Sequence, residues 1–173
     1  MATETIEQDH IDRFLASIAE SLPELDLEVE GIVDRIGGLS RRIHRMLDET
    51  LADQGLSNGE WKVLCALHQA GAPFRRSPGQ LAERAELSSG AMTNRLDRME
   101  EAGLVRRLRD PSDRRGVQVE LTDKGQRAHR KSVQTQAAKE ALVASALSDH
   151  EKVQLNALLR RLMIVAEKLE KDS

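Results

Sequence analysis

"SSGAMTNRLDRMEEAGLVRRLRDPSDRRGVQVELTDKG", residues 88–125, is the stretch of the chain that decides the fold. Its first part has helical periodicity, with Gly103 placed to end the helix and with inward apolar positions at Met92, Leu96 and Met99. Its second part has two short runs with Val and Leu at alternating positions, joined by PSDRR, which is typical of a β-hairpin. A short helix over 78–84, begun by a capping box, and a three-residue turn come before it. This order of helix, turn, helix and hairpin predicts a winged helix-turn-helix.

The outward face of the second helix carries the small and polar residues that fit the major groove of DNA. Hydroxyl and amide groups can hydrogen-bond base edges or phosphates, arginines can reach guanine edges, and a helix N-terminus offers N–H donors to a phosphate. On this basis the predicted DNA contacts of the helix are Ser88, Ser89, Gly90, Thr93, Asn94, Arg95 and Arg98. The alternative is an ordinary solvated helix.

The tip of the predicted hairpin adds a second set of candidate DNA contacts, Asp113, Arg114 and Arg115. Asp113 stands two residues before Arg115 and can hold its guanidinium in a bidentate pair, which would orient the arginine before it meets DNA. Arg114 is placed for a phosphate. The alternative is a surface turn with incidental ion pairs, which stabilise a fold very little.

The distribution of charge supports a nucleic-acid partner. The whole chain carries a net charge of -3, but residues 1–74 sum to -8, residues 75–131 to +5 and residues 132–173 to zero. A basic middle segment is what a DNA-binding face confined to one part of the chain would produce. The predicted partner is therefore double-stranded DNA.

Other function classes find little support in the sequence. There is no glycine-rich phosphate loop, nucleophile elbow or pair of carboxylates in an evident cleft, so we expect no enzyme, no catalytic residue and no cofactor. A single cysteine, Cys65, and five histidines without ligand spacing predict no metal site. The acidic N-terminus lacks an apolar run and no stretch is long enough to span a membrane, which predicts a cytoplasmic protein.

Long amphipathic helices are expected on both sides of the middle segment. Apolar residues alternate at spacings of four and three over 27–51 and again over 155–169, and a short extra helix precedes the first of them. These seams exceed what the small middle can cover, which predicts a homodimer. The expected regions are 1–54 for dimerisation, 55–122 for DNA binding and 123–173 for dimerisation. The fold class is thus mainly α with a small β-hairpin wing and a helical dimerisation region from both termini.

The residues of the helix and the hairpin together resemble the MarR family of winged-helix transcriptional regulators. The family's wing signature has the form D-R-R-x-x-x-V-x-L-T, which this chain matches at Asp113, Arg114, Arg115, Val119, Leu121 and Thr122. The resemblance covers roughly residues 30–170. It implies a homodimer on a palindromic operator, a recognition helix in the major groove, an arginine of the wing (best matched by Arg115) in the minor groove, and repression relieved by a small molecule or an oxidant.

The extra N-terminal helix and residues 22–45 further resemble the branch of the family that answers urate or aconitate-like organic anions. Two arginines of that branch's site match Arg95 and Arg107, whereas its tryptophan falls at Ile18 and its aspartate at Lys62. The resemblance therefore predicts an effector other than urate, with an organic carboxylate as the natural guest. The expected ligand-binding residues are His44, Trp61, Lys62, Arg95 and Arg107.

Two alternatives stay open at the level of sequence. Some relatives use a cysteine, so Cys65 could make the protein a redox-sensing regulator, although a thiol on a buried apolar helix is usually inert. The chain could also be a helical scaffold that does not bind DNA, in which case its coiled seams would be its main feature.

Overall fold

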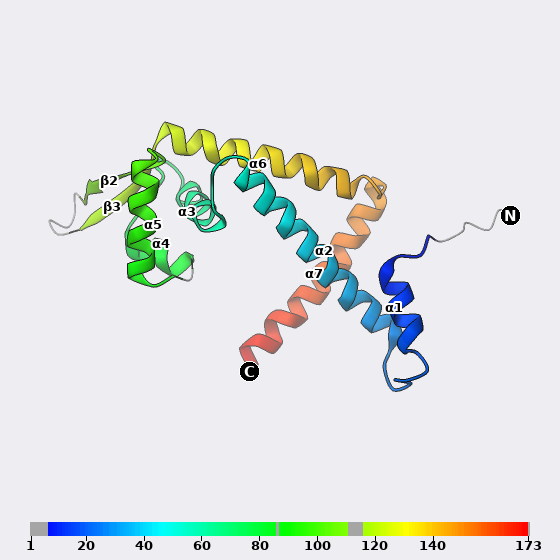
Figure 1. Ribbon diagram of the computed structural model, residues 1–173. Coiled ribbons are helices and arrows are strands. Elements are labelled where there is room, and N and C mark those ends of the chain that lie inside the picture. Colours follow the sequence, from blue (N-terminus) through cyan, green and yellow to red (C-terminus); the bar gives the residue numbers. More distant parts are fainter. Residues whose placement is uncertain (1–6, 86, 111–115, 173) are drawn as a thin grey trace. The chain divides into compact units, whose positions relative to one another are not determined.

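The computed structural model describes residues 7–85, 87–110 and 116–172. Within these residues the chain divides into two compact units, one up to Glu49 and one from Thr50 onward. The elements, in chain order (Figure 1), are α1 (His10–Ile18), α2 (Leu27–Ala52), α3 (Asn58–His68), β1 (Arg75–Arg76), α4 (Pro78–Arg84), α5 (Ser89–Glu101), β2 (Val105–Arg109), β3 (Val117–Leu121), α6 (Asp123–Ala144) and α7 (Asp149–Asp172). The predicted fold class, mainly α with a small β wing, is confirmed.

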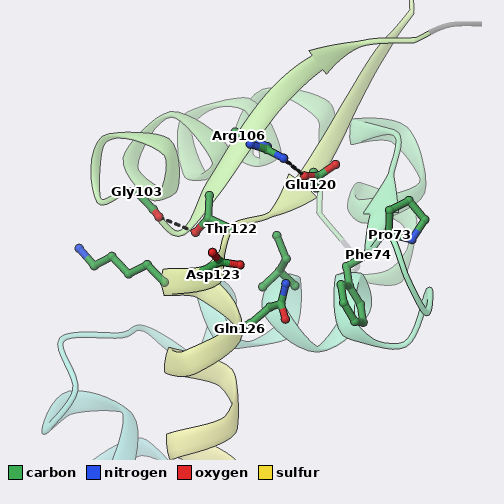
Figure 2. Close-up of a pocket in the computed structure, with 10 residues that line it drawn as sticks. Pro73, Phe74, Gly103, Arg106, Glu120, Thr122, Asp123 and Gln126 are labelled. Carbon is green, nitrogen blue, oxygen red and sulfur yellow. Dashed lines mark hydrogen bonds and ion pairs between the residues drawn. The ribbon is translucent and has the colours of Figure 1, made fainter.

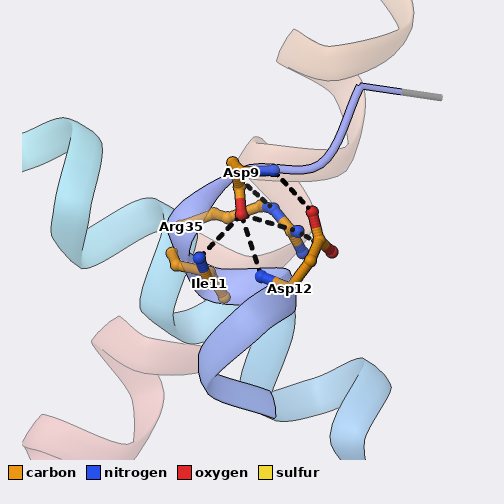
Figure 3. A network of polar contacts seen from close by, with 4 residues as sticks. All are labelled: Asp9, Ile11, Asp12 and Arg35. Carbon is orange, nitrogen blue, oxygen red and sulfur yellow. Dashed lines mark hydrogen bonds and ion pairs between the residues drawn. The ribbon is translucent and has the colours of Figure 1, made fainter. Parts of the chain in front are cut away.

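In the first unit, a polar network joins α1 to α2 (Figure 3). Asp9 caps α1 by accepting hydrogen bonds from the backbone N–H groups of Ile11 and Asp12, and Asp12 returns the contact to the N–H of Asp9. Arg35 of α2 binds both carboxylates, with N–O distances of 3.0 Å to Asp9 and 2.5 Å to Asp12. The hydrogen bond from Arg35 is the main reason that the pKa of Asp9 falls to about 2. The Asp9 carboxylate is therefore ionised, and able to bind Arg35, at any physiological pH.

Capping residues begin the helices of the second unit where the sequence predicts them. Ser57 and Ser77 each form a full capping box, with Glu60 and Gln80 as the returning side chains. Ser88 accepts from the N–H of Ala91 at the start of α5. A side-chain oxygen at this position satisfies a backbone donor that the helix cannot pair internally, which contributes about 1 kcal/mol. Local chemistry thus fixes where α3, α4 and α5 begin.

The core of the second unit lies where α3, α4 and α5 meet the sheet. Its side chains are almost fully inaccessible and come from every one of these elements: Val63, Leu64, Leu67, Leu81, Met92, Leu96, Met99, Val105 and Val119. α4 and α5 lie side by side and both pack against α3. Both helices of the helix-turn-helix motif, α4 and α5, are thus positioned by their packing on α3.

The sheet has three antiparallel strands in the order β1-β3-β2. β2 and β3 form the predicted hairpin, with Val105 opposite Leu121 and Arg109 opposite Val117. β1 is not predicted from the sequence, and it pairs only two residues, Arg75 with Glu120 and Arg76 with Val119. β3 is therefore the central strand, and the wing is anchored to a segment that precedes the helix-turn-helix.

α6 begins directly after β3 and is tied to the start of β2. Thr122, its N-cap, donates to the carbonyl oxygens of Gly103 at 2.7 Å and Leu104 at 3.0 Å. Gly125 makes this close approach possible, because a side chain there would collide with the carbonyl oxygen of Leu104. The hairpin and α6 consequently form one connected piece.

α7 has no buried residue in the single chain. Its exposed apolar side chains follow the spacing predicted for a seam and include Leu155, Leu158, Leu159, Leu162, Val165 and Leu169. α2 exposes a similar row at Ile32, Ile36, Leu39 and Ile43. Among the residues described, no helix combines the length and the apolar character needed to cross a bilayer.

Candidate nucleic-acid interface

α5 presents one face to the core and the opposite face to solvent. Met92, Leu96 and Met99 are buried, and the residues on the opposite side of the helix are exposed. The residues exposed on α5 and at its N-cap include six of the seven predicted DNA contacts, Ser88, Ser89, Gly90, Thr93, Asn94 and Arg98. The Thr93 hydroxyl donates to the Ser89 carbonyl oxygen at 2.9 Å. This exposed, polar face matches the geometry expected of a recognition helix.

Arg107 of β2 clamps one flank of α5. Its guanidinium contacts Asp97 and Glu100, each with an N–O distance of 2.6 Å, and its backbone N–H donates to Glu100 at 2.8 Å. Burial alone would lower the pKa of Arg107, but the hydrogen bonds to Glu100 and Asp97 outweigh it and raise the pKa. The arginine predicted to bind a ligand is thus engaged by two carboxylates of the helix that it faces.

Arg95, the seventh predicted contact of α5, lies on the opposite flank of the helix. Its side chain is half-buried, and its guanidinium lies over Gly59 in the first turn of α3. The Nε atom is inaccessible to solvent and has no hydrogen-bond partner among the described residues. Arg95 and Arg107, the two arginines matched to the branch that answers organic anions, therefore hold α5 from two sides.

Glu120 organises the base of the wing. It is nearly buried and pairs with Arg75 on one neighbouring strand and with Arg106 on the other. Burial alone would raise the pKa of Glu120, but the hydrogen bonds from Arg106 and Arg75 outweigh it and lower the pKa. Glu120 and Arg106 border a recess of about 510 Å³ between β3 and the first turn of α6 (Figure 2). The pair with Arg106 joins the two strands of the hairpin, and the pair with Arg75 fixes the hairpin to β1.

The tip of the wing falls in a part of the chain that is not described. The predicted contacts Asp113, Arg114 and Arg115 lie outside the described residues. On the near side of the tip, the N–H of Asp110 donates to the Gly116 carbonyl oxygen at 2.9 Å, and Gln118 donates to the Asp110 carboxylate at 2.5 Å. These contacts continue the pairing of β2 and β3 up to the tip.

The predicted ligand residues are distributed over several surfaces. Trp61 and Lys62 line a recess of about 270 Å³ together with Cys65, Gln69 and Arg84. His44 belongs to the first compact unit, where its Nδ1 atom lies 2.8 Å from the Ser40 carbonyl oxygen. Within the second unit, the structure therefore brings together Trp61 and Lys62 but leaves the two arginines on the flanks of α5.

Comparisons with known proteins bear on this arrangement. Residues 56–117 match the family model of the MarR family. The chain is 35% identical over 139 residues to the HTH-type transcriptional regulator PecS of Dickeya dadantii, a match that covers 80% of this chain and 84% of PecS. The chain belongs to the MarR family. It is therefore a DNA-binding transcriptional regulator, and the family predicted from the wing signature is confirmed.

Solved structures of MarR-type winged-helix proteins share the fold. The YusO protein of Bacillus subtilis has a TM-score of 0.70 and 26% identity, over 80% of this chain and 96% of that one. A mutant of S. aureus MepR bound to an oligodeoxyribonucleotide has a TM-score of 0.62 over 78% of this chain and 97% of that one. At 19% identity, the second likeness shows the fold alone.

Cys65 is chemically quiet in this MarR-family chain. Burial raises the pKa of its thiol to about 11, although the residue borders the recess of Trp61 and Lys62. Oxidation and disulfide exchange proceed through the thiolate, which such a pKa almost eliminates at neutral pH. The redox alternative therefore gains no support from the surroundings of Cys65.

Four aromatic rings form a column that the sequence analysis missed. Trp61, His129, His68 and Phe74 stack in this order, with centroid distances of 5.1, 4.3 and 5.5 Å. The rings come from α3, α6 and the segment before β1. Only a contact between residues far apart in sequence could have revealed the column. It is the main aromatic contribution to the packing of α6 on α3.

The column predicts a pH dependence of stability. Burial, followed by the charge of His68, lowers the pKa of His129 below its ordinary 6.5. The folded state then binds fewer protons than the unfolded state, so the free energy of unfolding rises with pH. This contribution is complete above pH 6.5 and is lost as the pH falls below it. Between pH 7.5 and pH 5.5, the free energy of unfolding measured with urea should fall more for the wild type than for His129→Phe, which keeps an aromatic ring. An equal decrease in the free energy of unfolding of His129→Phe would show that His129 is not the cause. The control is His150→Gln on exposed α7, which is expected to behave as the wild type.

Proposed function

We propose that this protein binds a palindromic operator as a homodimer and represses transcription until a small organic anion or phenolic effector binds. In each protomer, α5 enters the major groove and the tip of the wing enters the minor groove. The observation that carries the proposal is the exposed polar face of α5. The helix itself packs on the core and is held on its two flanks by Arg107 and Arg95. A regulator that binds chromosomal DNA acts in the cytoplasm, where we place it.

The exposed apolar rows support the homodimer. A soluble chain rarely leaves so many large apolar side chains in contact with water, and α7 alone carries nine of them. We assign regions 1–54 and 123–173 to dimerisation and region 55–122 to DNA binding. Two copies related by a two-fold axis would place their recognition helices in successive major grooves, about 34 Å apart.

The recess of Trp61 and Lys62 supports an anionic effector. Trp61 offers an aromatic wall, and Lys62 and Arg84 offer two positive charges. An effector that prefers the conformation unable to bind DNA would shift the population towards it. We therefore retain an organic carboxylate or a phenolate as the effector class, with Trp61 and Lys62 as its first contacts.

The wing test uses a duplex selected by the protein from a random library. Replacing both Arg114 and Arg115 by Ala is expected to weaken binding at least about 100-fold, because two positive charges at the DNA are removed. Fluorescence anisotropy measures the binding, and sedimentation velocity is expected to show an unchanged oligomeric state. The control, Arg160→Ala with Arg161→Ala, removes the same charge from α7, and because α7 belongs to the proposed dimerisation region its oligomeric state is checked by the same sedimentation measurement.

Two outcomes decide between the proposal and its alternatives. Binding that survives the replacement of Arg114 and Arg115 unchanged would contradict the role of the wing. A wild-type protein that selects no duplex at all, yet remains dimeric, would favour the helical scaffold.

A further inference from the structure

We infer that Gly59 leaves the space in which the Arg95 guanidinium packs, and that Arg95 sets the position of the recognition helix instead of contacting DNA. The inference rests on the proposed function only in taking α5 as the helix that enters the groove. It assigns a role to Gly59, and it moves Arg95 from the set of predicted DNA contacts to a positioning role.

The position of Arg95 on α5 carries the first step. Thr93, Asp97 and Glu100 share the flank that Arg107 clamps, since they are spaced four and three residues apart. Arg95 lies two residues from Thr93 and two from Asp97, about 200° round the helix from each of them. Its side chain therefore points to the other flank, where α3 lies.

Gly59 supplies the second step. A Cβ atom built on Gly59 would fall within the Arg95 guanidinium, so the absence of a side chain is what admits the arginine. Gly59 lies in the first turn of α3, and in a helix interior glycine is less favourable than alanine by roughly 0.5–1 kcal/mol. The backbone of Gly59 is outside the left-handed region, so the conformational freedom of glycine is not needed there. The structure shows one physical reason for this glycine, the room that it leaves for the guanidinium.

The buried Nε atom supplies the third step. A guanidinium reaching out to a phosphate would keep its donors in water until DNA arrived. In Arg95 the Nε atom is instead withdrawn from solvent without a hydrogen-bond partner among the described residues. The planar group is thus used for packing between α5 and α3, a role that a lysine cannot fill.

The two flanks together define how α5 sits on the domain. Arg107 reaches in from β2 to the carboxylates of α5, and Arg95 reaches out from α5 to the backbone of α3. Removal of either arginine takes away one of two lateral supports of the helix. A helix that tilts by a small amount no longer fits the base edges, whereas its interactions with phosphates tolerate the change better.

The test compares Arg95→Ala, Arg95→Lys, Gly59→Ala and the double variant Gly59→Ala with Arg95→Ala. Affinities for the selected duplex and for a scrambled duplex are measured by anisotropy over a series of salt concentrations. Each variant is expected to bind the selected duplex about tenfold more weakly, with the scrambled duplex and the salt slope unchanged. The double variant is expected to bind no more weakly than either single one, because both remove the same interaction.

Arg98→Ala is the matched control, since Arg98 is an exposed arginine on the same helix. It is expected to flatten the salt slope by about one for each phosphate that the protein no longer neutralises. If Arg95→Ala flattens the slope as Arg98→Ala does, or if Arg95→Lys binds as the wild type, Arg95 contacts DNA and the inference is wrong. Additive effects in the double variant would also overturn it. Should Gly59→Ala not fold, Arg95→Lys decides alone. If neither Arg98→Ala nor the wing variant affects binding, the proposed function fails instead.

Discussion

Replacing Arg107 by alanine is expected to weaken binding to the selected duplex by about 100-fold, or about 3 kcal/mol. Arg107 is the partner of both Asp97 and Glu100, whose carboxylates lie on the recognition helix. Without the arginine side chain, two carboxylates without their ion-pair partner would face the phosphate backbone, and α5 would keep only the backbone hydrogen bond from residue 107 to Glu100. Anisotropy with the selected duplex measures the effect, and thermal unfolding verifies that the variant is folded.

A rescue experiment separates the two causes. Adding Asp97→Asn and Glu100→Gln to the Arg107→Ala variant removes the unpaired charges but does not restore the side-chain contacts between β2 and α5, so a partial recovery of affinity is expected. If Arg107 served the effector alone, Arg107→Ala would keep full DNA affinity and lose only the response to effector. That result would reject the clamp and restore the role predicted from the family resemblance.

Replacing Gly125 by alanine is expected to lower the free energy of unfolding by about 2–4 kcal/mol, and the melting temperature by roughly 5–15 °C. The added methyl group would meet the backbone of Leu104, which cannot rotate away as a side chain can. α6 would then have to move off the start of β2, which would break the hydrogen bonds of Thr122 to Gly103 and Leu104. Urea unfolding at a fixed protein concentration measures the change.

Gly79→Ala is the control for this prediction. Gly79 also lies in a helix, and the nearest atom to an added Cβ is the Ser77 hydroxyl oxygen at 3.9 Å, an ordinary van der Waals distance. There the alanine is expected to change stability by less than about 1 kcal/mol and to increase it, because glycine is the poorer helix former. Similar decreases in stability from Gly125→Ala and Gly79→Ala would show that the approach of α6 to Leu104 has no special cost.

The sequence predicts well those features that local chemistry determines. The starts of α3, α4 and α5 follow from Ser57, Ser77 and Ser88, because a capping residue and its partner lie within three positions of each other. The hairpin follows from the alternation of apolar residues around a turn. In each case the information lies within a few residues of the feature.

The features that the sequence analysis missed depend on contacts between distant residues. β1 has two residues and becomes recognisable only when Glu120 lies opposite Arg75. The pairing of Arg107 with Glu100 had a local signal, since the two residues flank the turn at Gly103, which has a φ of 68°. The family resemblance instead predicts that Arg107 binds a ligand. Nothing in the sequence indicates that Gly59 leaves room for Arg95, because the two residues meet only when α5 packs on α3.

The pairing of β1 with β3 also has a consequence for how the domain folds. Arg75 and Glu120 are 45 positions apart, and both helices of the helix-turn-helix lie within the loop that they close. Closing so long a loop costs entropy before the two-residue strand returns any stabilisation, so this pairing is expected late in folding. Once it forms, the segment that carries α4 and α5 is joined at both ends to the sheet. Amide hydrogens in α5 and β3 should then exchange through one shared opening, so that the two elements that meet DNA form and open as a single cooperative unit.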